Sequence, residues 1–198
     1  MSLATIVLAA GGSTRLGGQP KQLLTHNGQT LIRQITQSAL SLETGPVFVV
    51  LGAKDEQIRP ELADLPITVT VNTDWHEGLA SSIRAGLQLF SDESIEAFLV
   101  VLTDQPHITT DLLQQLINTR HYTGKGIVAC RYGESGHLGV PALFDIGYKT
   151  PFMALSGDVG ARKLIQQHAD DCADIAFPLA AVDLDTWQDV ARWREAEG

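Results

Sequence analysis

Two basic side chains, Arg15 and Lys21, lie in a glycine-rich segment near the start of the chain. The segment follows an apolar run at residues 6–10 and has glycines at positions 11, 12, 17 and 18. Glycine takes positive φ and lets the backbone approach closely, so this loop can direct several N–H groups at one anion. Two cations on the same loop favour a polyphosphate as that anion. A glycine-rich turn that binds nothing is the alternative.

The spacing of this loop excludes the two commonest phosphate-binding loops. A P-loop requires GxxxxGK[ST], and the nearest register, Gly12 to Gly17, continues with Gly18 and Gln19. A dinucleotide-binding loop requires GxGxxG opening directly into a helix, whereas Pro20 interrupts this segment. The loop is therefore of a third kind.

A carboxylate, Asp104, follows the apolar run 98–102 and precedes Pro106. Because the proline fixes the turn, the carboxylate is held at the rim of a sheet, where it could bridge a hard divalent cation to phosphate oxygens. We therefore predict that Asp104 binds Mg²⁺. The alternative is a helix cap, but Thr109 and Thr110 are better placed to cap the helix that follows.

The segment from Asn72 to Gly86 opens a helix with small residues and two serines, Ser81 and Ser82. Helix-start N–H groups and serine hydroxyls can bind the base and ribose edges of a nucleotide. The same serines could equally be ordinary residues of a first helical turn. This signal is weak alone.

Two aspartates, Asp183 and Asp185, end a short apolar strand pattern late in the chain. Alternation along a strand places both carboxylates on one face, from which they could share a cation. An N-cap role for Asp185 or Thr186 is the competing interpretation.

The elements that must position these groups alternate between strand and helix patterns. Runs that are apolar throughout suit strands of a sheet covered on both faces, and five are predicted: 6–10, 47–52, 67–71, 98–102 and 127–130. Helical spacing occurs between them at 31–42, 56–65, 79–90 and 112–119, the last preceded by an N-cap candidate at Thr109. This order predicts an α/β fold in three αβα layers around a mostly parallel, doubly wound sheet, with ligands at the carboxyl ends of the strands. No repeat or linker divides the chain, so one domain over residues 1–198 is expected.

The composition excludes several classes of protein. The formal net charge is −9 with no Lys/Arg cluster, which argues against nucleic-acid binding. The longest apolar runs are too short to cross a bilayer and no signal-peptide pattern is present, so we expect no membrane association and a cytoplasmic location. Cys130 and Cys172 lack metal-ligand spacing and are expected as core thiols. The six histidines form no HxH or HExxH pattern, and no GxSxG is present.

Four segments together carry a resemblance to a known family. Residues 8–24, LAAGGSTRLGGQPKQLL, resemble the LAAGxSxRMGxxKxLL signature of the MobA-like nucleotidyltransferases. Residues 78–84 are similar to the family's G-[LM]-x-x-S-[IL], residues 103–106 to its [TG]D-[QM]-P, and residues 183–186 to its D-[IL]-D-T-P. Within the family the chain most resembles the molybdenum cofactor cytidylyltransferase (MocA) branch.

The resemblance implies a Rossmann-like fold of the nucleotide-diphospho-sugar transferase type and an Mg²⁺-dependent nucleotidyl transfer. A terminal phosphate oxygen of the acceptor would attack the α-phosphorus of a nucleoside triphosphate, and pyrophosphate would leave. Arg15, Lys21 and Asp104 would be catalytic, with the metal on Asp104 and Asp185. The implied nucleotide-binding residues are Leu8, Ala9, Ala10, Gly11, Gly12, Ser13, Arg15, Lys21, Asn72, Gly78, Ser82 and Asp104.

The same resemblance favours CTP as the nucleotide. Ala9-Ala10-Gly11 resembles the AAG of cytidylyl-transferring relatives rather than the AGG of the guanylyl-transferring branch, and the Ala10 methyl could narrow the pocket against a purine. The segment 20–24 is similar to the PKQ-x-L of methylerythritol phosphate cytidylyltransferases, but their DAARP is TDQPH here. A guanylyltransferase, a sugar-phosphate or polyol-phosphate cytidylyltransferase and a non-catalytic nucleotide-binding protein stay open as alternatives. A redox Rossmann domain is disfavoured because GxGxxG is missing.

The acceptor is expected to be a phosphorylated small molecule. Relatives that act on molybdenum cofactor carry GHPVLF, whereas residues 139–144 read GVPALF, with Val140 at the histidine position. The resemblance implies molybdenum cofactor as one candidate acceptor, with a molybdoenzyme maturation partner as the corresponding protein partner, but valine at this position counts against a pterin. Residues 156–162 match the family's GDxGAR, so Arg162 could bind the acceptor phosphate. Alternatively, Asp158 caps the next helix and Arg162 is solvated.

Overall fold

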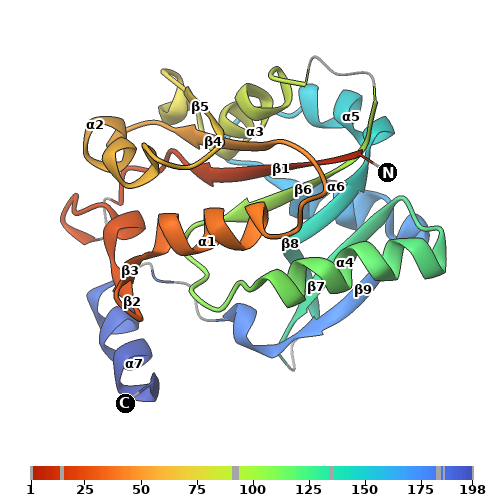
Figure 1. The fold of residues 1–198 in the computed structure, drawn as a ribbon. Helices are drawn as coiled ribbons and strands as arrows, with labels where there is room; N and C mark the ends of the chain where they lie inside the picture. Colours follow the sequence, from red (N-terminus) through yellow and green to blue (C-terminus); the bar gives the residue numbers. More distant parts are fainter. Residues whose placement is uncertain are drawn as a thin grey trace.

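A seven-stranded sheet runs through the described part of the chain (Figure 1). The computed structural model describes residues 2–13, 16–90, 94–133, 136–181, 184 and 186–197. The strands lie in the order β5 (Thr68–Val71), β4 (Val47–Leu51), β1 (Ser2–Ala9), β6 (Ile95–Leu102), β8 (His137–Asp145), β7 (Ile127–Tyr132) and β9 (Cys172–Phe177). β8 is antiparallel to both of its neighbours, and the other pairings are parallel. The predicted mostly parallel sheet is confirmed.

The strand order reverses beside β1. The chain moves outward from β1 to β4 and β5, then returns to place β6 on the other side of β1. In doubly wound sheets, loops that leave the carboxyl ends of the strands on the two sides of this reversal diverge and open a crevice for ligands. The glycine-rich loop after β1 and the Asp104 loop after β6 are these two loops.

Alternate residues of β1 enter two separate hydrophobic layers. Leu3 and Val7 pack on one face, under α1 (Leu31–Leu40) and α4 (Thr110–Thr123). Ile6 and Leu8 pack on the other face, under α3 (Leu79–Leu87), α5 (Lys149–Met153) and α6 (Ala161–Gln167). The side-chain period of two produces this division, and it explains why apolar residues follow one another along the strand without a polar alternation. Figure 1 shows α1 and α4 on the near face of the sheet. The three αβα layers are therefore as predicted.

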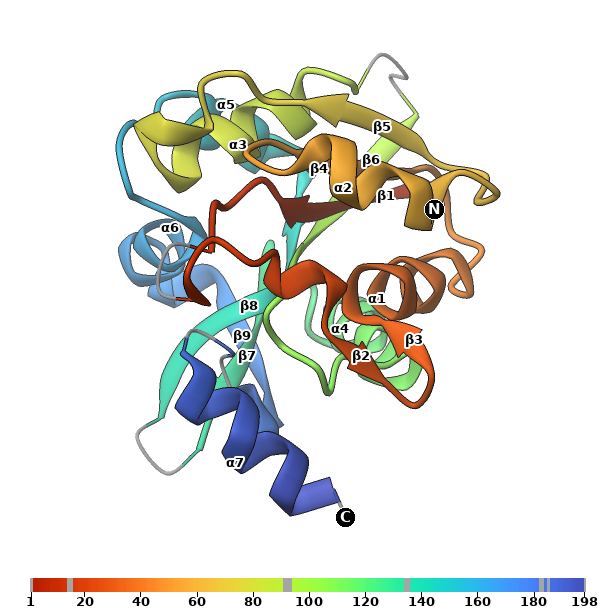
Figure 2. The same cartoon turned by 90° about the vertical axis from the view of Figure 1, so that its left-hand side faces the viewer.

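The remaining elements are short. The hairpin β2 (Thr25–His26) and β3 (Gln29–Thr30) lies beside the C-terminal helix α7 (Trp187–Glu197) in Figure 1, and Figure 2 shows α7 from the side. Ring centroids of His26 and Trp193 are 5.2 Å apart across this contact. The other short helices are α2 (Asp55–Ile58), η2 (Lys21–Leu23), η3 (Arg59–Leu62), η4 (Trp75–Glu77), η5 (Ile146–Tyr148), η6 (Ala169–Asp171) and η7 (Pro178–Ala181).

The predicted elements exist with small shifts of their bounds, except the helix at 56–65. It is a short α2 followed by the 3-10 helix η3, because Pro60 has no N–H to continue the α-helical ladder. The predicted cap is confirmed, since Thr109 accepts a hydrogen bond from the N–H of Leu112. Thr186 also acts as a cap, and its hydroxyl accepts from the N–H of Asp189 at 3.2 Å.

The sequence analysis missed β8 and β9. β8 contains Gly139 and Pro141, which normally interrupt strands. Its pairing with β7 shifts register between Ala129 and Cys130, so Ala129 faces Ala142 while Cys130 faces Gly139. This irregularity accommodates the proline within an interior strand.

The cysteines are free thiols, as predicted. Burial raises the pKa of the Cys130 thiol to about 12 and that of Cys172 to about 11. In the described part of the chain, no helix is both long and apolar enough to cross a membrane.

Candidate active site

The loop after β1 is shaped by hydrogen bonds to its backbone. The carbonyl of Ala10 accepts from the N–H of Ala53 at 3.1 Å. The side-chain amide of Gln22 donates to the carbonyls of Ala9 at 3.0 Å and Gly11 at 3.3 Å. Gln22 is only 1% exposed. These bonds hold the carbonyl groups of the loop, so its peptide planes are fixed before any ligand arrives.

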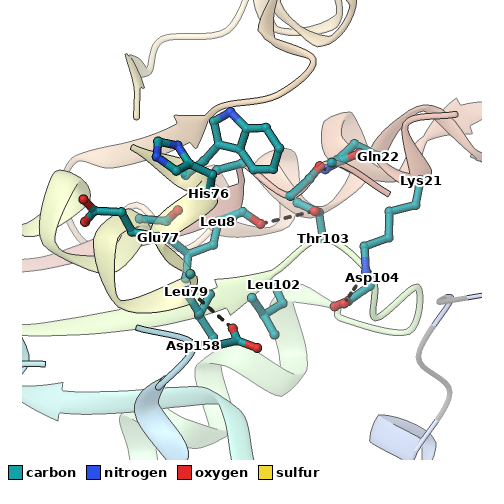
Figure 3. Close-up of a pocket in the computed structure, with 16 residues that line it drawn as sticks. Leu8, Lys21, Gln22, His76, Glu77, Leu79, Leu102, Thr103, Asp104 and Asp158 are labelled. Carbon is teal, nitrogen blue, oxygen red and sulfur yellow. Dashed lines mark hydrogen bonds and ion pairs between the residues drawn. The ribbon is translucent and has the colours of Figure 1, made fainter. Parts of the chain in front are cut away.

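Lys21 starts a 3-10 helix that brings it back to the loop. Pro20 precedes this helix with the extended backbone it requires. The N–H of Lys21 donates to the Ser13 hydroxyl at 3.1 Å, which ties the two ends of the loop together. The Lys21 side chain then reaches Asp104, and Nζ lies 2.7 Å from Oδ2 (Figure 3). Both side chains are 16% exposed.

Asp104 is held at the end of β6 from two sides. The hydroxyl of the preceding residue, Thr103, donates to the carbonyl of Leu8 at 3.2 Å and locks β6 to β1. The Asp104 carbonyl accepts from the N–H of Leu184 at 3.1 Å, so the C-terminal segment closes on this loop. Among the described residues, the second carboxylate oxygen, Oδ1, is buried and has no hydrogen-bond partner.

The start of α3 forms the opposite side of the site. Gly78 has φ 107°, and a Cβ there would lie 2.5 Å from the carbonyl carbon of Gly157, so no side chain fits. The carboxylate of Asp158 accepts from the N–H of Leu79 at 3.5 Å. α6 begins after Gly160 with no side-chain cap. The alternative that Asp158 caps the helix that follows it is therefore wrong, and its carboxylate contacts the start of α3 instead.

Asn72 fixes the two serines of α3. Its amide donates to the hydroxyls of Ser81 at 2.8 Å and Ser82 at 3.0 Å. Ser81 in turn donates within this loop, to the carbonyl of Gly78 at 2.8 Å. Ser81 is thus occupied by the first helical turn, while Ser82 faces a cavity.

A cavity of about 580 Å³ lies between these segments. This volume is within the range of about 300–1,000 Å³ usual for small-molecule sites. In Figure 3 Lys21 and Asp104 lie at one end of the cavity, and Glu77 and Asp158 lie at the other. The walls are Leu8, Ala10, Gly11, Gly12, Lys21, Gln22, Trp75, His76, Glu77, Gly78, Leu79, Ser82, Leu102, Thr103, Asp104 and Asp158.

The structure brings most of the predicted site residues to this cavity. Those that line it are Leu8, Ala10, Gly11, Gly12, Lys21, Gly78, Ser82 and Asp104. Ala9, Ser13 and Asn72 do not line it, and they support it through the hydrogen bonds given above. Arg15, Asp183 and Asp185 fall outside the described residues, so the structure says nothing of their predicted roles.

Several lining residues were not predicted. Gln22 belongs to the PKQ segment and Asp158 to the GDxGAR segment, both of which the resemblance had already brought out. The Trp75 indole packs against Gly12, where a Cβ would lie 3.3 Å from its ring. These three residues lay within noted motifs, but their roles depend on contacts that the motifs do not state.

The described residues fit a divalent cation at one point. The buried, unpartnered Oδ1 of Asp104 is a hard oxygen ligand of the kind Mg²⁺ prefers. No cluster of three or more His, Cys, Asp or Glu side chains suited to a metal occurs in the described ranges. Such an ion would need oxygen ligands beyond Asp104, which a bound phosphate could supply.

Comparisons with known proteins agree on one family. A family model described as the MobA-like NTP transferase domain matches residues 5–172. The chain is 30% identical over 195 residues to nicotine blue oxidoreductase of Paenarthrobacter nicotinovorans, covering 94% of each chain. It is 32% identical over 120 residues to the bifunctional protein GlmU of Francisella philomiragia, but this match spans only 26% of that longer protein.

Solved structures give the same result for the fold. Rv0371c from Mycobacterium tuberculosis superimposes with a TM-score of 0.84 at 29% identity, over 98% of each chain. A second crystal structure of Rv0371c, in complex with manganese, has a TM-score of 0.81 at 26% identity, over 99% of this chain and 100% of that one. A 4-diphosphocytidyl-2C-methyl-D-erythritol synthase from Anaerococcus prevotii has a TM-score of 0.73 at 13% identity, which supports the fold alone. The expected nucleotide-diphospho-sugar transferase fold is confirmed.

Proposed function

Because the chain belongs to the MobA-like NTP transferase domain family, it is an enzyme of the nucleotidyltransferase class. We propose that it transfers CMP from CTP to a phosphorylated small molecule. A single nucleotidyltransferase domain over residues 1–198 is part of the proposal. The continuous sheet from β5 to β9 supports it.

One observation carries the proposal. Lys21 and Asp104 are 83 positions apart in sequence, yet their side chains meet at 2.7 Å at one end of a nucleotide-sized cavity. A cation and a carboxylate at the carboxyl ends of neighbouring parallel strands suit a triphosphate with its counter-ion. A dinucleotide oxidoreductase needs no such pair.

The reaction would place little covalent chemistry on the protein. An acceptor phosphate oxygen forms a bond to the α-phosphorus of CTP, the bond from that phosphorus to the bridging oxygen breaks, and pyrophosphate leaves. Positioning and charge neutralisation dominate such transfers. Lys21 would stabilise charge on the phosphates, and the loop held by Gln22 would orient them. Arg15 is proposed to assist Lys21.

Asp104 would hold a divalent cation, with Asp185 as the proposed second ligand. Enzymes of this family commonly use divalent metals, and the relative from M. tuberculosis has been solved with manganese. Mg²⁺ is proposed for this chain because the ligand offered is a carboxylate oxygen. When bound, the ion would neutralise phosphate charge. Lys21, whose Nζ contacts Oδ2 of Asp104, would donate to the phosphates of a bound nucleotide.

The first experiment measures pyrophosphate release with CTP, Mg²⁺ and a phosphate monoester as the acceptor. Lys21→Ala and Asp104→Ala are each expected to lower turnover by at least about 100-fold, since each removes charge stabilisation from the transferring phosphates. Asp64→Ala is the matched control, because it breaks another ion pair of 2.7 Å, with Arg33, on α1. Full activity in both site variants would refute nucleotidyl transfer.

A second experiment tests the base. Thermal stabilisation by CTP, UTP, GTP and ATP with Mg²⁺ is compared, and CTP is expected to give the largest shift because the Ala10 methyl lines the cavity. At a concentration of 100 times its Kd, a ligand stabilises the folded protein by about 2.7 kcal/mol. A larger shift with GTP would favour a guanylyltransferase.

One observation favours a second function. The relative that matches over 94% of its length is named an oxidoreductase, so redox chemistry at this cavity is the competing proposal. It predicts saturable binding of NADH, which a fluorescence titration would detect, and no pyrophosphate release with any acceptor. A non-catalytic nucleotide-binding protein would bind CTP and give neither result.

A further inference from the structure

A second, smaller cavity adjoins the first. Its volume is about 190 Å³, and it shares the walls Leu8, Leu79 and Leu102 with the larger cavity. In Figure 3 Leu102 lies between Asp158 and Asp104, and Leu79 lies close to Asp158. A molecule in the smaller cavity would therefore lie directly beside the proposed nucleotide.

The interior of the smaller cavity is apolar. Ile83 and Val100 are each 1% exposed and Ala161 is 3% exposed, and all three line it. From β8, Leu138 and Val140 add to the apolar wall, while Gly139 and the exposed His137 line the cavity from the same strand. The charge lies at its edge, where Arg162 is exposed and has no hydrogen-bond or ion-pair partner among the residues described.

The hydroxyl group in this wall is already engaged. Tyr132 donates to the carbonyl of Val140 and accepts from the Gln105 amide at 3.0 Å. Its ring lies so close to Gly139 that a Cβ there would be 2.7 Å from the hydroxyl oxygen. The tyrosine therefore shapes the wall more than it offers a ligand contact.

Size and polarity together limit what can bind. An apolar cavity of about 150 Å³ holds one benzene molecule, so this one admits one ring with a small substituent, or a short branched chain. A pterin edge or a polyol would bring several donors and acceptors into this apolar interior, and unpaired polar groups there are costly. Val140 stands where the molybdenum cofactor relatives have histidine, which removes one polar partner.

We propose that the acceptor is a phosphate monoester of a compact apolar group, aromatic or branched aliphatic, whose body occupies this smaller cavity. Arg162 supplies the cation for its phosphate. The inference rests on the proposed function: an oxygen of that phosphate bonds to the α-phosphorus of CTP, the bond to the bridging oxygen breaks, and pyrophosphate leaves. The product is a mixed diphosphate of cytidine and the apolar group.

Binding is tested by calorimetry with three probes: benzyl phosphate, glycerol 3-phosphate and 6-hydroxymethylpterin. Each is titrated into the full chain with and without Mg²⁺ and a non-hydrolysable CTP analogue. Benzyl phosphate is expected to bind at least tenfold more tightly than either polar probe. Equal or tighter binding of glycerol 3-phosphate or the pterin would overturn the inference.

Two variants test the location. Ala161→Leu fills the cavity from α6, and Val140→Phe fills it from the half-buried face of β8 if the first variant folds poorly. Each is expected to weaken benzyl phosphate at least tenfold without changing CTP binding. Ala191→Leu is the matched control, on an exposed position of α7. Unchanged benzyl phosphate affinity in both cavity variants would also overturn the inference.

The charge is tested separately. Arg162→Gln is expected to weaken benzyl phosphate at least fivefold and leave benzyl alcohol unaffected. CTP binding without benzyl phosphate binding would refute this inference and leave the proposed function standing. Benzyl phosphate binding without CTP binding would refute nucleotidyl transfer itself, and with it the acceptor role of the cavity.

Discussion

Lys21 and Asp104 neutralise each other in the ligand-free protein, and this pairing shapes how the site must work. At 2.7 Å and 16% exposure the pair is well shielded from water. Removing one member of a shielded pair leaves the other charge uncompensated, which costs more than the pair itself contributes. Lys21→Ala and Asp104→Ala are therefore both expected to lower the unfolding temperature. Their turnover should be measured well below that temperature.

Gln22 is the residue whose role the structure reveals most directly. Its amide group satisfies two loop carbonyls from a position that is 1% exposed. Without it, both carbonyls would lose a buried partner, and the peptide planes of the loop would be free to turn.

Gln22→Met is expected to destabilise the fold by about 1–3 kcal/mol and to raise the KM for the nucleotide more than it lowers kcat. Urea unfolding and steady-state kinetics measure the two effects. Gln57→Met on the exposed side of α2 is the control. A variant with wild-type KM would show that the loop keeps its shape without the amide.

The junction between η4 and α3 is the decisive feature at the scale of elements. Gly78 ends the one and begins the other, and its φ of 107° turns the chain so that α3 points its first residues at the cavity. The same glycine allows the loop at Gly157 to pack directly on it. One position thus joins a wall of the larger cavity to the segment that leads into α6.

Gly78→Ala is expected to be strongly destabilising, by more than about 2 kcal/mol, because backbone strain adds to a steric clash. Gly124→Ala separates the two effects. That glycine also has positive φ, at 65°, but a Cβ there meets nothing within 4 Å. The free energy of unfolding of Gly124→Ala, measured with urea, is expected to fall by only about 1–2 kcal/mol. Equal losses in both variants would mean that the contact with Gly157 is unimportant.

At the scale of the whole molecule, a surface ion pair joins α1 to the segment between η3 and β5. Arg33 on α1 forms a bidentate contact with Asp64, at 2.8 and 2.7 Å. The hydrogen bond from Arg33 lowers the pKa of the Asp64 carboxyl to about 2. Because this folded-state pKa lies below the unfolded value of about 4, the pair stabilises the protein above pH 4, and the contribution is lost as pH falls from 4 to 2.

Asp64→Asn is therefore expected to reduce the dependence of Tm on pH between 4 and 2, with a small loss of stability at neutral pH. Differential scanning calorimetry across this range measures it. Because the pair is exposed, added salt should reduce the difference between the two proteins. Asp55→Asn is the comparison, since the nearest guanidinium nitrogen of Arg59 is 3.7 Å away. If Tm falls between pH 4 and 2 as steeply in Asp64→Asn as in the wild type, the Arg33–Asp64 pair does not contribute to this pH dependence.

Much of the fold could be predicted from local patterns. β4 and the apolar runs within β1 and β6 reflect a sheet covered on both faces, and that composition is visible without coordinates. β8 could not be predicted in this way. Its Gly139 and Pro141 signal a loop, and only the register shift against β7 makes room for the proline.

The order of the first strands and helices and of the chemical groups between them followed from the amino-acid sequence alone, because side-chain period, glycine, proline and helix caps act over a few residues. It placed the glycine-rich loop, Lys21 and Asp104 at the carboxyl ends of strands. Only the tertiary structure decided that Lys21 and Asp104 touch, that Asp158 contacts α3 rather than capping α6, and that a second apolar cavity adjoins the first. Such contacts join residues far apart in the chain, and they depend on how the layers pack.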